Sequence, residues 1–317
     1  MKASLGYVGL AVREPEEIAE KLHRDFGLVR AHASLNALGG GRLTVPVLGI
    51  GRSALVLMGV GEGPAHDMDR PGVHHLVLHT NDRDSDLATA KATGIEISSP
   101  TAALNGTPAV ELAAERLGGV RTFLSEPLDL PESTAGPVER IDHIGVASAD
   151  NHVVLDMYCD QIGFTLESRQ TDREVGTAVE TFTSDKYGVV RHSRPPELIG
   201  GLRVAFVTIG DCELEFLQNF DPRQDGAVDH GTRGTTRQDQ GAISRYIASR
   251  GAGLHHLAFK VADIDGLLAH LANAGYEVID PIGRPGSRRA RIGFIHPRSM
   301  GGVLVHLVER SEISGSI

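Results

Sequence analysis

The chain has 317 residues, of which 41% are hydrophobic, and it carries a formal net charge of −10 with a pI of about 5.8. This length predicts two domains, each large enough to bury a hydrophobic core. The acidic balance argues against nucleic acid as a partner, because phosphate binding needs a basic surface. No apolar run reaches the roughly 18 residues of a membrane span. Cys159 and Cys212 lie within apolar patterns, so we expect free thiols in a reducing cytoplasm and no disulfide framework.

Four segments along the chain share a strand-like pattern that ends at an acidic residue. They are YVGLAVRE (7–14), HLVLHTND (75–82), HIGVASAD (143–150) and HLAFKVAD (256–263). After each segment, apolar residues recur at three- and four-residue spacing, which indicates an amphipathic helix. The acidic residue is a favourable helix N-cap, and a glycine follows near the far end of each helix. These glycines are Gly27, Gly94, Gly163 and Gly275.

Further short apolar runs follow each predicted helix, so one unit consists of a strand, a helix and about three strands. The runs are VPVLGI and SALVLMG in the first unit, GGVRTFLSEP in the second, GLRVAFVTIG and CELEFLQ in the third, and RIGFIHP and GGVLVHLVE in the fourth. The stretch EPLDLPESTAGPVER (126–140) is rich in Pro, Ser and acidic residues, which is typical of a linker. We therefore predict an α+β fold with two tandem domains of paired βαβββ units, at 1–130 and 140–312, joined by a linker at 131–139.

This order of elements, twice per domain and twice per chain, resembles the vicinal oxygen chelate superfamily. Members of that superfamily include glyoxalase I, extradiol dioxygenases and methylmalonyl-CoA epimerase. The resemblance is strongest in ASRGAGLHHLAFKVADIDGLLAHLANAGYEVID (248–280) and RPGSRRARIGFIHPRSMGGVLVHLVE (284–309), which are similar to the second half of methylmalonyl-CoA epimerases. The resemblance implies tandem glyoxalase-like domains, in which two units form a cupped mixed sheet around a divalent metal ion.

The resemblance also implies where metal ligands belong, namely on the first and the last strand of each paired unit. In the C-terminal half these positions hold His143, Glu215, His256 and His306. Imidazole and carboxylate ligands together accept Fe, Zn, Co, Ni or Mn, so the metal identity stays open. In the N-terminal half the same positions hold Tyr7, Val56, His75 and Phe123. We therefore predict a metal-bearing C-terminal domain and a degenerate site in the N-terminal domain.

Two near-copies, GVHHLVLHTND (72–82) and GLHHLAFKVAD (253–263), each contain a pair of histidines. Because side chains alternate across a strand, the first histidine of each pair, His74 or His255, is expected on the face opposite to the second. We predict structural roles for these two residues.

His306 departs from the superfamily pattern, in which the last-strand ligand is usually a carboxylate. We interpret it first as a ligand and second as a general base, because the ordinary pKa of an imidazole lies near neutral pH. The segment TDREVGTAVETFTSDKYGVVRHSRPPEL (171–198) adds Glu180, Tyr187 and His192 as candidate acid, base or substrate contacts. An exposed hairpin is the alternative interpretation of this segment.

Two further segments lie close to the expected metal site in this arrangement. The polar, glycine-rich stretch 220–241 is a candidate lid, followed by a short amphipathic helix in AISRYIASR. Four arginines in GRPGSRRARIGF are candidates for binding a phosphate or carboxylate, with a solvated hairpin as the alternative. They are Arg284, Arg288, Arg289 and Arg291.

Three functions are compatible with these features. The first is a metal-dependent isomerase, epimerase or lyase that stabilises the enolate of a carbonyl or acyl-CoA-like substrate bound through two adjacent oxygens. The second is an Fe(II)-dependent extradiol or 2-oxo-acid dioxygenase, which the pairing of an empty with a metal-bearing domain favours. The third is a resistance protein that sequesters a ligand without turnover. The partner is a small molecule in each case, and the tandem chain leaves a homodimer open.

Overall fold

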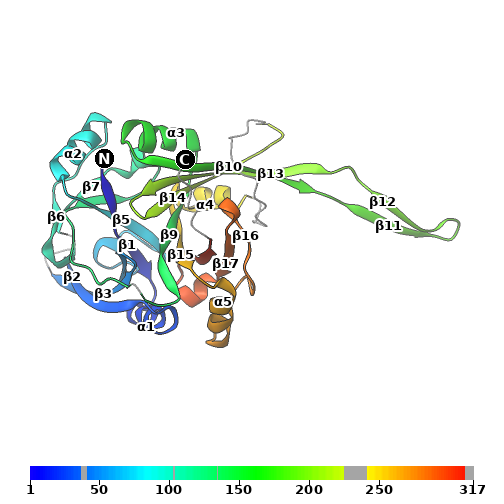
Figure 1. Ribbon diagram of the computed structural model, residues 1–317. Coiled ribbons are helices and arrows are strands. Elements are labelled where there is room, and N and C mark those ends of the chain that lie inside the picture. The colour runs from blue at the N-terminus through cyan, green and yellow to red at the C-terminus, as the bar shows by residue number, and fades with distance from the viewer. Residues whose placement is uncertain (37–40, 103, 134, 225–240, 311–317) are drawn as a thin grey trace.

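The computed structural model describes residues 1–36, 41–102, 104–133, 135–224 and 241–310 (Figure 1). Its strands form two eight-stranded mixed sheets, one from each half of the chain, and a separate two-stranded ribbon. The N-terminal sheet consists of β1 (Ala3–Val12), β2 (Val29–Asn36), β3 (Arg42–Ile50), β4 (Ser53–Gly59), β5 (Gly72–Thr80), β6 (Thr101–Ala102), β7 (Pro108–Leu112) and β8 (Thr122–Ser125). The C-terminal sheet consists of β9 (Val138–Ala147), β10 (Thr165–Gly176), β13 (Glu197–Ile209), β14 (Cys212–Phe220), β15 (Gly253–Val261), β16 (Arg284–Pro285), β17 (Arg291–Ile295) and β18 (Val305–Glu309).

The two sheets have the same topology, which confirms the predicted α+β fold with tandem pairs of βαβββ units. Their strand orders are β2-β3-β4-β1-β5-β8-β7-β6 and β10-β13-β14-β9-β15-β18-β17-β16. In each sheet the first strands of the two units pair antiparallel at the centre, β1 with β5 and β9 with β15. Each first strand also runs parallel to the last strand of its own unit. The four strands that were predicted to carry ligands are therefore the central four of each sheet.

Each unit has a helix after its first strand, and three of the four predicted caps are present. The helices are α1 (Pro15–Phe26), α2 (Arg83–Ala92), α3 (Asn151–Leu155) and α5 (Ile264–Asn273), with α4 (Ala242–Arg250) as an addition before β15. Asp82, Asp150 and Asp263 each accept a backbone N–H of the helix that follows. The prediction is wrong for Glu14, whose backbone is left-handed with a φ of 52° and whose side chain makes no cap hydrogen bond.

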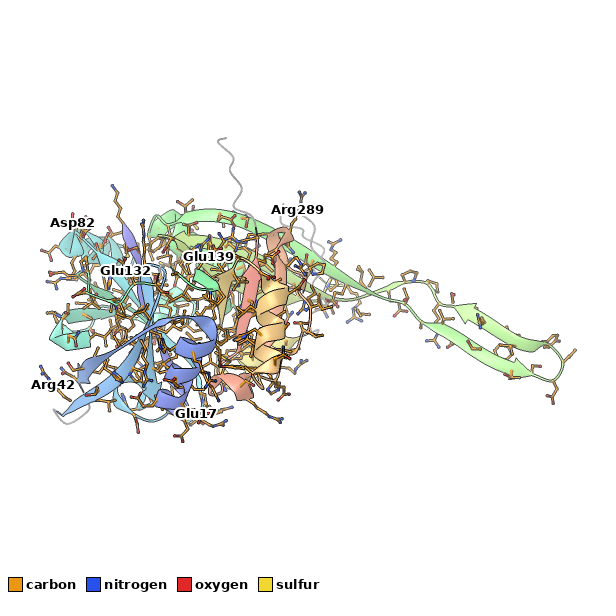
Figure 2. All side chains as sticks on the ribbon, turned by 60° about the horizontal axis from the view of Figure 1, so that its bottom comes forward. Glu17, Arg42, Asp82, Glu132, Glu139 and Arg289 are labelled. Carbon is orange, nitrogen blue, oxygen red and sulfur yellow. The ribbon has the colours of Figure 1, made fainter. Side chains whose placement is uncertain are left out.

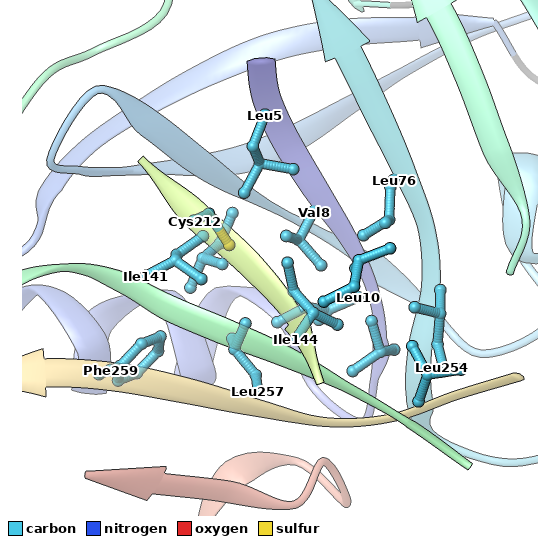
Figure 3. Packing of buried hydrophobic residues seen from close by; sticks show 14 of the residues in the cluster. Leu5, Val8, Leu10, Leu76, Ile141, Ile144, Cys212, Leu254, Leu257 and Phe259 are labelled. Atoms are coloured by element: carbon cyan, nitrogen blue, oxygen red, sulfur yellow. The ribbon is translucent and has the colours of Figure 1, made fainter. Parts of the chain in front are cut away.

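One continuous hydrophobic core joins the two halves of the molecule. Leu5, Val8 and Leu10 of β1 belong to the same buried cluster as Ile144 of β9 and Leu257 of β15 (Figure 3). The helices α1, α2, α3 and α5 bury apolar residues in this cluster as well, so it occupies the outer side of both sheets, which these helices cover. The inner side of each sheet, where the predicted ligand positions lie, is left to form a separate cup.

The connection between the sheets runs from the end of β8 to the start of β9, and the boundary that we propose between two domains falls inside it. Ser133 in this connection exchanges two backbone hydrogen bonds with Gly51, at 3.0 and 3.2 Å. The connection is therefore attached to the N-terminal sheet. No helix in the described part of the chain is long and apolar enough to cross a membrane.

Candidate metal centre

A β-bulge in β15 directs both histidines of the pair toward the same cup. The register of β15 against β9 shifts between Leu254 and His256, which makes room for one extra residue. As a result Leu254 and Leu257 lie in the hydrophobic core, whereas His255 and His256 both line the cavity of the C-terminal cup. The expectation that His255 faces the opposite side is wrong, because strict alternation fails at a bulge. Its Nδ1 lies 3.0 Å from Nδ1 of His256.

The same kind of β-bulge is present in β5 of the N-terminal half. The register against β1 shifts beside His74, and Nδ1 of His74 lies 2.7 Å from Nδ1 of His75. The prediction of opposite faces is therefore wrong for this pair too. Here Nε2 of His74 contacts Arg121 at 2.7 Å and Asp67 at 3.3 Å, and the structural role expected for His74 stays a prediction.

A glycine on the neighbouring strand accommodates the second histidine of each pair. Gly145 of β9 is paired with His256, and Gly9 of β1 is paired with His75. A Cβ atom added to Gly145 would lie 2.0 Å from Cε1 of His256, and one added to Gly9 would lie 2.1 Å from Cε1 of His75. Each imidazole therefore lies directly over the backbone of the adjacent strand, a position that any larger residue would block.

The four predicted ligand positions of the C-terminal half meet at the floor of its cup. Nε2 of His143 and Nε2 of His256 each lie 3.3 Å from Oε2 of Glu215. Nε2 of His306 lies 3.1 Å from Nε2 of His143. The ligand atoms of the three histidines lie within 4.8 Å of one another, and all four side chains are buried.

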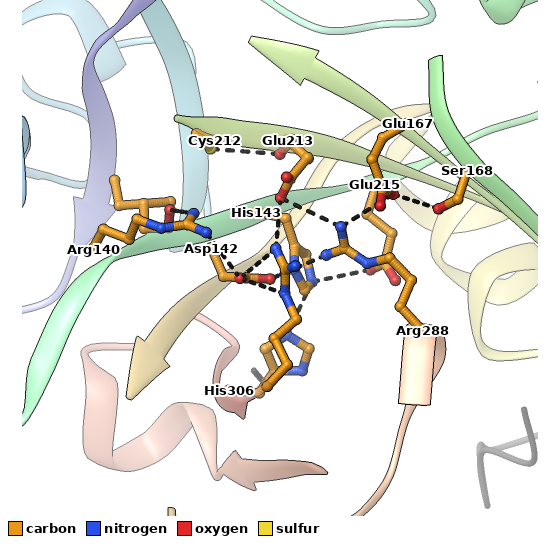
Figure 4. Close-up of polar contacts among 12 residues, drawn as sticks. Arg140, Asp142, His143, Glu167, Ser168, Cys212, Glu213, Glu215, Arg288 and His306 are labelled. Carbon is orange, nitrogen blue, oxygen red and sulfur yellow. Dashed lines mark hydrogen bonds and ion pairs between the residues drawn. The ribbon is translucent and has the colours of Figure 1, made fainter. Parts of the chain in front are cut away.

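A second set of charged residues surrounds His143 (Figure 4). Asp142 is fully buried, and its Oδ2 accepts the Nδ1 hydrogen of His143 at 2.9 Å. Arg310 and Arg288 donate to the two carboxylate oxygens of Asp142 at 3.0 and 3.2 Å. A carboxylate on Nδ1 fixes the tautomer that leaves the Nε2 lone pair for a metal. Asp142 shares a face with His143 because a second register shift occurs beside it.

The carboxylates of this cluster determine the protonation of His143. Burial alone would lower its pKa, but Glu215 and Asp142 together raise it to about 9. Burial would likewise raise the pKa of Glu215, but contact with His143 and His256 holds it well below the ordinary value. When a proton rather than a metal ion is bound, His143 is an imidazolium that forms an ion pair with the carboxylate of Glu215.

The arrangement fits a divalent metal ion. Nε2 of His256 is buried and has no hydrogen-bond partner that meets the usual geometry, although Oε2 of Glu215 lies 3.3 Å away. A buried polar atom without a hydrogen bond is costly unless another partner satisfies it. Three imidazoles and one carboxylate that converge in this way match the N/O donor set of Zn, Fe, Co, Ni or Mn. His143, Glu215, His256 and His306 are therefore candidate ligands of one metal ion.

A cavity of about 480 Å³ opens above these four residues. Its wall is mostly aliphatic and aromatic, with Phe206, Leu217 and Ile292 among the lining residues. Arg284 and Arg288 also line it, and each contacts a carboxylate, although Nη1 of Arg284 is buried without a hydrogen-bond partner. Arg284 contacts Asp280 at 3.0 Å, and Arg288 stacks 3.7 Å from the ring of Phe206 while it contacts Asp142. The cavity therefore suits the apolar part of a small molecule.

The N-terminal cup contains a hydrophobic cluster where the C-terminal cup has its ligands. The ring of His75 meets those of Tyr7 and Phe123 edge to face, with centroids 5.6 and 5.3 Å apart. Tyr7, Val56 and neighbouring aliphatic residues of β3 and β4 form one buried cluster. Burial lowers the pKa of His75 well below its ordinary value, so it is neutral. In the described part of this half, no other ligand-type side chain joins His75 at the four ligand positions.

The structure does not bring Glu180, Tyr187 and His192 to the cavity. They lie on β11 (Val179–Ser184), at the turn, and on β12 (Gly188–Ser193), the two strands of an exposed ribbon that projects from the body (Figure 1). Glu180 faces His192 across the ribbon. The alternative interpretation of this segment, an exposed hairpin, describes what is found. Most of the candidate lid, at 225–240, lies outside the described residues, and the predicted helix after it is α4.

The sequence analysis missed Asp142, Arg310 and Gly145, and it placed His255 on the wrong face of its strand. Asp142 stands directly before His143 in RIDHIGVAS. Neighbouring residues of a regular strand face opposite sides, so the sequence would indicate a contact between them only if the bulge could be predicted. Gly145, two positions after His143, has its counterpart in Gly9, two positions after Tyr7. This repeated spacing was the available signal for the glycine.

A cupped sheet of paired βαβββ units with a cluster of histidines at its floor defines a glyoxalase-like protein with a candidate metal centre. The chain belongs to the Glyoxalase/Bleomycin resistance protein/Dioxygenase superfamily, whose sequence profile matches residues 140–307. The matched region contains the four candidate ligands and lies wholly in the C-terminal half.

The chain is also similar to individual proteins. The chain is 38% identical to the uncharacterized protein YqjC of Bacillus subtilis over 172 residues, which is 54% of this chain and 93% of YqjC. It is 22% identical to the mitochondrial methylmalonyl-CoA epimerase of Dictyostelium discoideum over 174 residues, which is 55% of this chain and 80% of the epimerase. A mutant of 4-hydroxymandelate synthase from Streptomyces coelicolor has a similar structure over 100% of this chain and 95% of its own, with a TM-score of 0.65 and 17% identity. This last likeness concerns the fold.

Proposed function

We propose that this protein is a metal-dependent enzyme that catalyses an isomerase, epimerase or lyase reaction on a small carbonyl or acyl-CoA-like substrate. The observation that carries the proposal is the convergence of His143, Glu215, His256 and His306 at the floor of an apolar cavity. A divalent metal held there would act as a Lewis acid toward a substrate with two adjacent oxygens and would stabilise an enolate. The sequence similarity to an epimerase supports this class of reaction.

The residues of the chain divide the remaining work between them. His143 is held in one tautomer by Asp142, which keeps its Nε2 directed at the ligand cluster. His306 Nε2 lies in contact with His143 Nε2, which favours the ligand role over the separate base. Glu215 is the only carboxylate among the described residues that line the cavity, so we assign it proton transfer next to the substrate carbonyl. The apolar wall excludes water and holds the body of the substrate.

Hydrogen exchange at the substrate carbon tests this reaction. The metal-loaded protein would be incubated without oxygen in deuterium oxide with a panel of acyl-CoA thioesters, including methylmalonyl-CoA, and 2-oxo acids. We expect deuterium to enter next to the carbonyl of at least one substrate. Glu215→Gln, whose amide oxygen can still face a metal, is expected to slow this exchange by roughly 10²–10⁴-fold. Exchange at the wild-type rate in Glu215→Gln would contradict the role of Glu215.

A second candidate is an Fe(II) dioxygenase, and one observation favours it. His143, His256 and Glu215 are two histidines and one carboxylate in mutual contact, the set used by non-haem Fe(II) oxygenases. An oxygen electrode separates the two candidates. Bound iron together with substrate-dependent oxygen uptake, and no anaerobic exchange, would replace the first proposal with this one.

A further inference from the structure

The ribbon that projects from the C-terminal sheet, together with the strand ends that lead into it, carries most of the large hydrophobic side chains that are exposed in the described part of the chain. We call residues 175–199 the arm; it comprises β11, β12 and the ends of β10 and β13 that lead into them. Ten large hydrophobic side chains are exposed in the described part of the chain, and six of them belong to the arm. These six are Val175, Val179, Phe182, Tyr187, Val189 and Ile199. So dense a set in one short segment is typical of a protein interaction surface.

The outer part of the arm has no sheet partner in the rest of the described chain. β11 and β12 pair only with each other, and both views show the arm leading away from the body (Figures 1 and 2). A two-stranded hairpin without further packing is at best marginally stable in water. At roughly 3.3 Å per residue, the nine or so residues of each side extend about 30 Å, which is close to the diameter of a small domain. The arm is long enough to span the face of another folded domain.

The apolar residues lie on both faces of the arm. Cross-strand pairing puts Phe182 opposite Val190 on one face, and Val189 opposite Thr183 on the other. One ion pair forms within the arm, since Arg194 donates to Glu180, and His192 lies 3.8 Å from the same carboxylate.

The electrostatics favour a second copy of this chain as the partner. The arm has three acidic residues, at 180, 185 and 197, and three basic ones, at 186, 191 and 194, so its formal charge is zero in a chain of net charge −10. A neutral arm is not repelled by an acidic copy, whereas an arm meant for a basic partner would be acidic.

A receiving surface of matching character lies beside the cavity of the same chain. Four large hydrophobic side chains are exposed outside the arm, and two of them, Ile279 and Ile282, are close in sequence in the loop between α5 and β16. Ile279 also lines the cavity of the candidate metal centre. Because the arm leads away from its own body, it meets this surface on another copy.

We propose that the arm of one copy docks on the surface around Ile279 and Ile282 of a second copy, and that a two-fold exchange of arms forms a homodimer. Both surfaces are on the same chain, so each copy gives one and receives one, as a closed symmetric dimer requires. This inference does not rest on the proposed reaction, because it concerns surfaces outside the ligand cluster.

Sedimentation velocity of the full chain tests the proposal. We expect a dimer whose dissociation constant rises at least roughly 30-fold in the double variant Phe182→Asp/Val189→Asp, the effect of losing one interface hot spot. Ile279→Asp/Ile282→Asp should raise it similarly. Val153→Asp, at an exposed valine of α3, is the matched control and should leave the dimer unchanged. Circular dichroism and metal content establish that each variant is folded.

A crosslink tests which surfaces meet. In a Cys159→Ser background, Phe182→Cys with Ile282→Cys should give a disulfide-linked dimer on oxidation, whereas Phe182→Cys with Val153→Cys should not. The proposal is overturned if the wild type sediments as a monomer, if either aspartate pair leaves the dissociation constant unchanged, or if both cysteine pairs crosslink equally.

Discussion

The two cups of this molecule have one backbone plan and different contents. Each has a bulged histidine pair on the first strand of its second unit, and each has a glycine beneath the second histidine. In the C-terminal cup the histidine meets two imidazoles and a carboxylate, whereas in the N-terminal cup it meets Tyr7 and Phe123. The bulge and the glycine are thus properties of the fold, and the four ligand positions decide whether a metal can bind.

The difference extends to the residues behind the ligands. Asp142, which orients His143, has Gly6 as its counterpart, and a Cβ added to Gly6 would lie 2.2 Å from Nε2 of His79. The N-terminal cup therefore lacks three of the four ligands and also the carboxylate that would orient one of them. A hydrophobic cluster made of residues of the N-terminal half fills this cup instead.

The strongest test of this comparison removes the equivalent histidine from each cup. His256→Ala should reduce the metal content of the purified protein from about one ion per chain to near zero, because it removes one of the converging ligands. His75→Ala should keep the wild-type metal content and lose roughly 2 kcal/mol of stability through the cavity it creates. Metal analysis and urea denaturation measure the two effects. Wild-type metal content in His256→Ala would refute the candidate centre.

The glycines give a second matched pair. Gly145→Ala and Gly9→Ala each force a Cβ into the ring of the histidine above, at 2.0 and 2.1 Å. Both should lower the free energy of unfolding by about 1–3 kcal/mol, the usual cost of overpacking. Only Gly145→Ala should also weaken metal binding, by roughly 10–100-fold, because it displaces His256. Competition with a metal-sensitive dye measures this affinity, and an equal loss in both variants would show that the cups are not as different as we infer.

Asp142→Asn tests whether the residues behind the ligands of the C-terminal cup contribute to metal binding. The amide keeps the shape of Asp142 but loses the charge that holds the His143 tautomer, so metal affinity should fall roughly 10-fold. Arg310→Gln removes the hydrogen bond that Arg310 donates to Oδ1 of Asp142, and it should lower the metal affinity by a smaller factor. Full metal affinity in Asp142→Asn would mean that the ligand geometry does not depend on this carboxylate.

The fold could be predicted because it depends on periodic patterns, whereas the candidate ligand positions come from the resemblance to the vicinal oxygen chelate superfamily. Four repeats of strand, cap, helix and glycine specify the units, and their alignment places His143 over Tyr7 and His306 over Phe123 in register. The pairing of β9 with β14 and of β1 with β4 agrees with that alignment, since His143 pairs with Glu213 and Tyr7 with Ala54.

The bulges could not be predicted, and the residues that depend on them were missed or misplaced. An extra residue in one strand leaves no periodic trace, because it shifts the alternation only locally. His255 and Asp142 both reach the cup for this reason, although each is next to a residue that also faces it. The arm shows a related limit, since the alternation of TDREVGTAVETF fits a strand of the body as well as a strand that leaves it.

The smallest effect concerns the support that the N-terminal half gives to the other. The carboxylate of Asp25, at the end of α1, accepts a hydrogen bond from the hydroxyl of Tyr276 at 2.7 Å across the interface between the halves. Hydrogen bonds from Arg24 and Tyr276 hold the pKa of Asp25 below its ordinary value, against the effect of burial. A carboxylate whose pKa is lower in the folded state stabilises the fold at pH values above the unfolded pKa of about 3.9. This stabilisation is lost as the pH falls through the folded pKa.

Asp25→Asn should therefore lower the free energy of unfolding by about 1 kcal/mol at neutral pH and by progressively less below about pH 4. Tyr276→Phe, which keeps the edge-to-face contact with Phe26, should cost the same or less, and neither variant should change the metal content. Urea denaturation at a series of pH values measures the difference, and a cost for Asp25→Asn that stays constant down to acid pH would exclude the ionised carboxylate as its source.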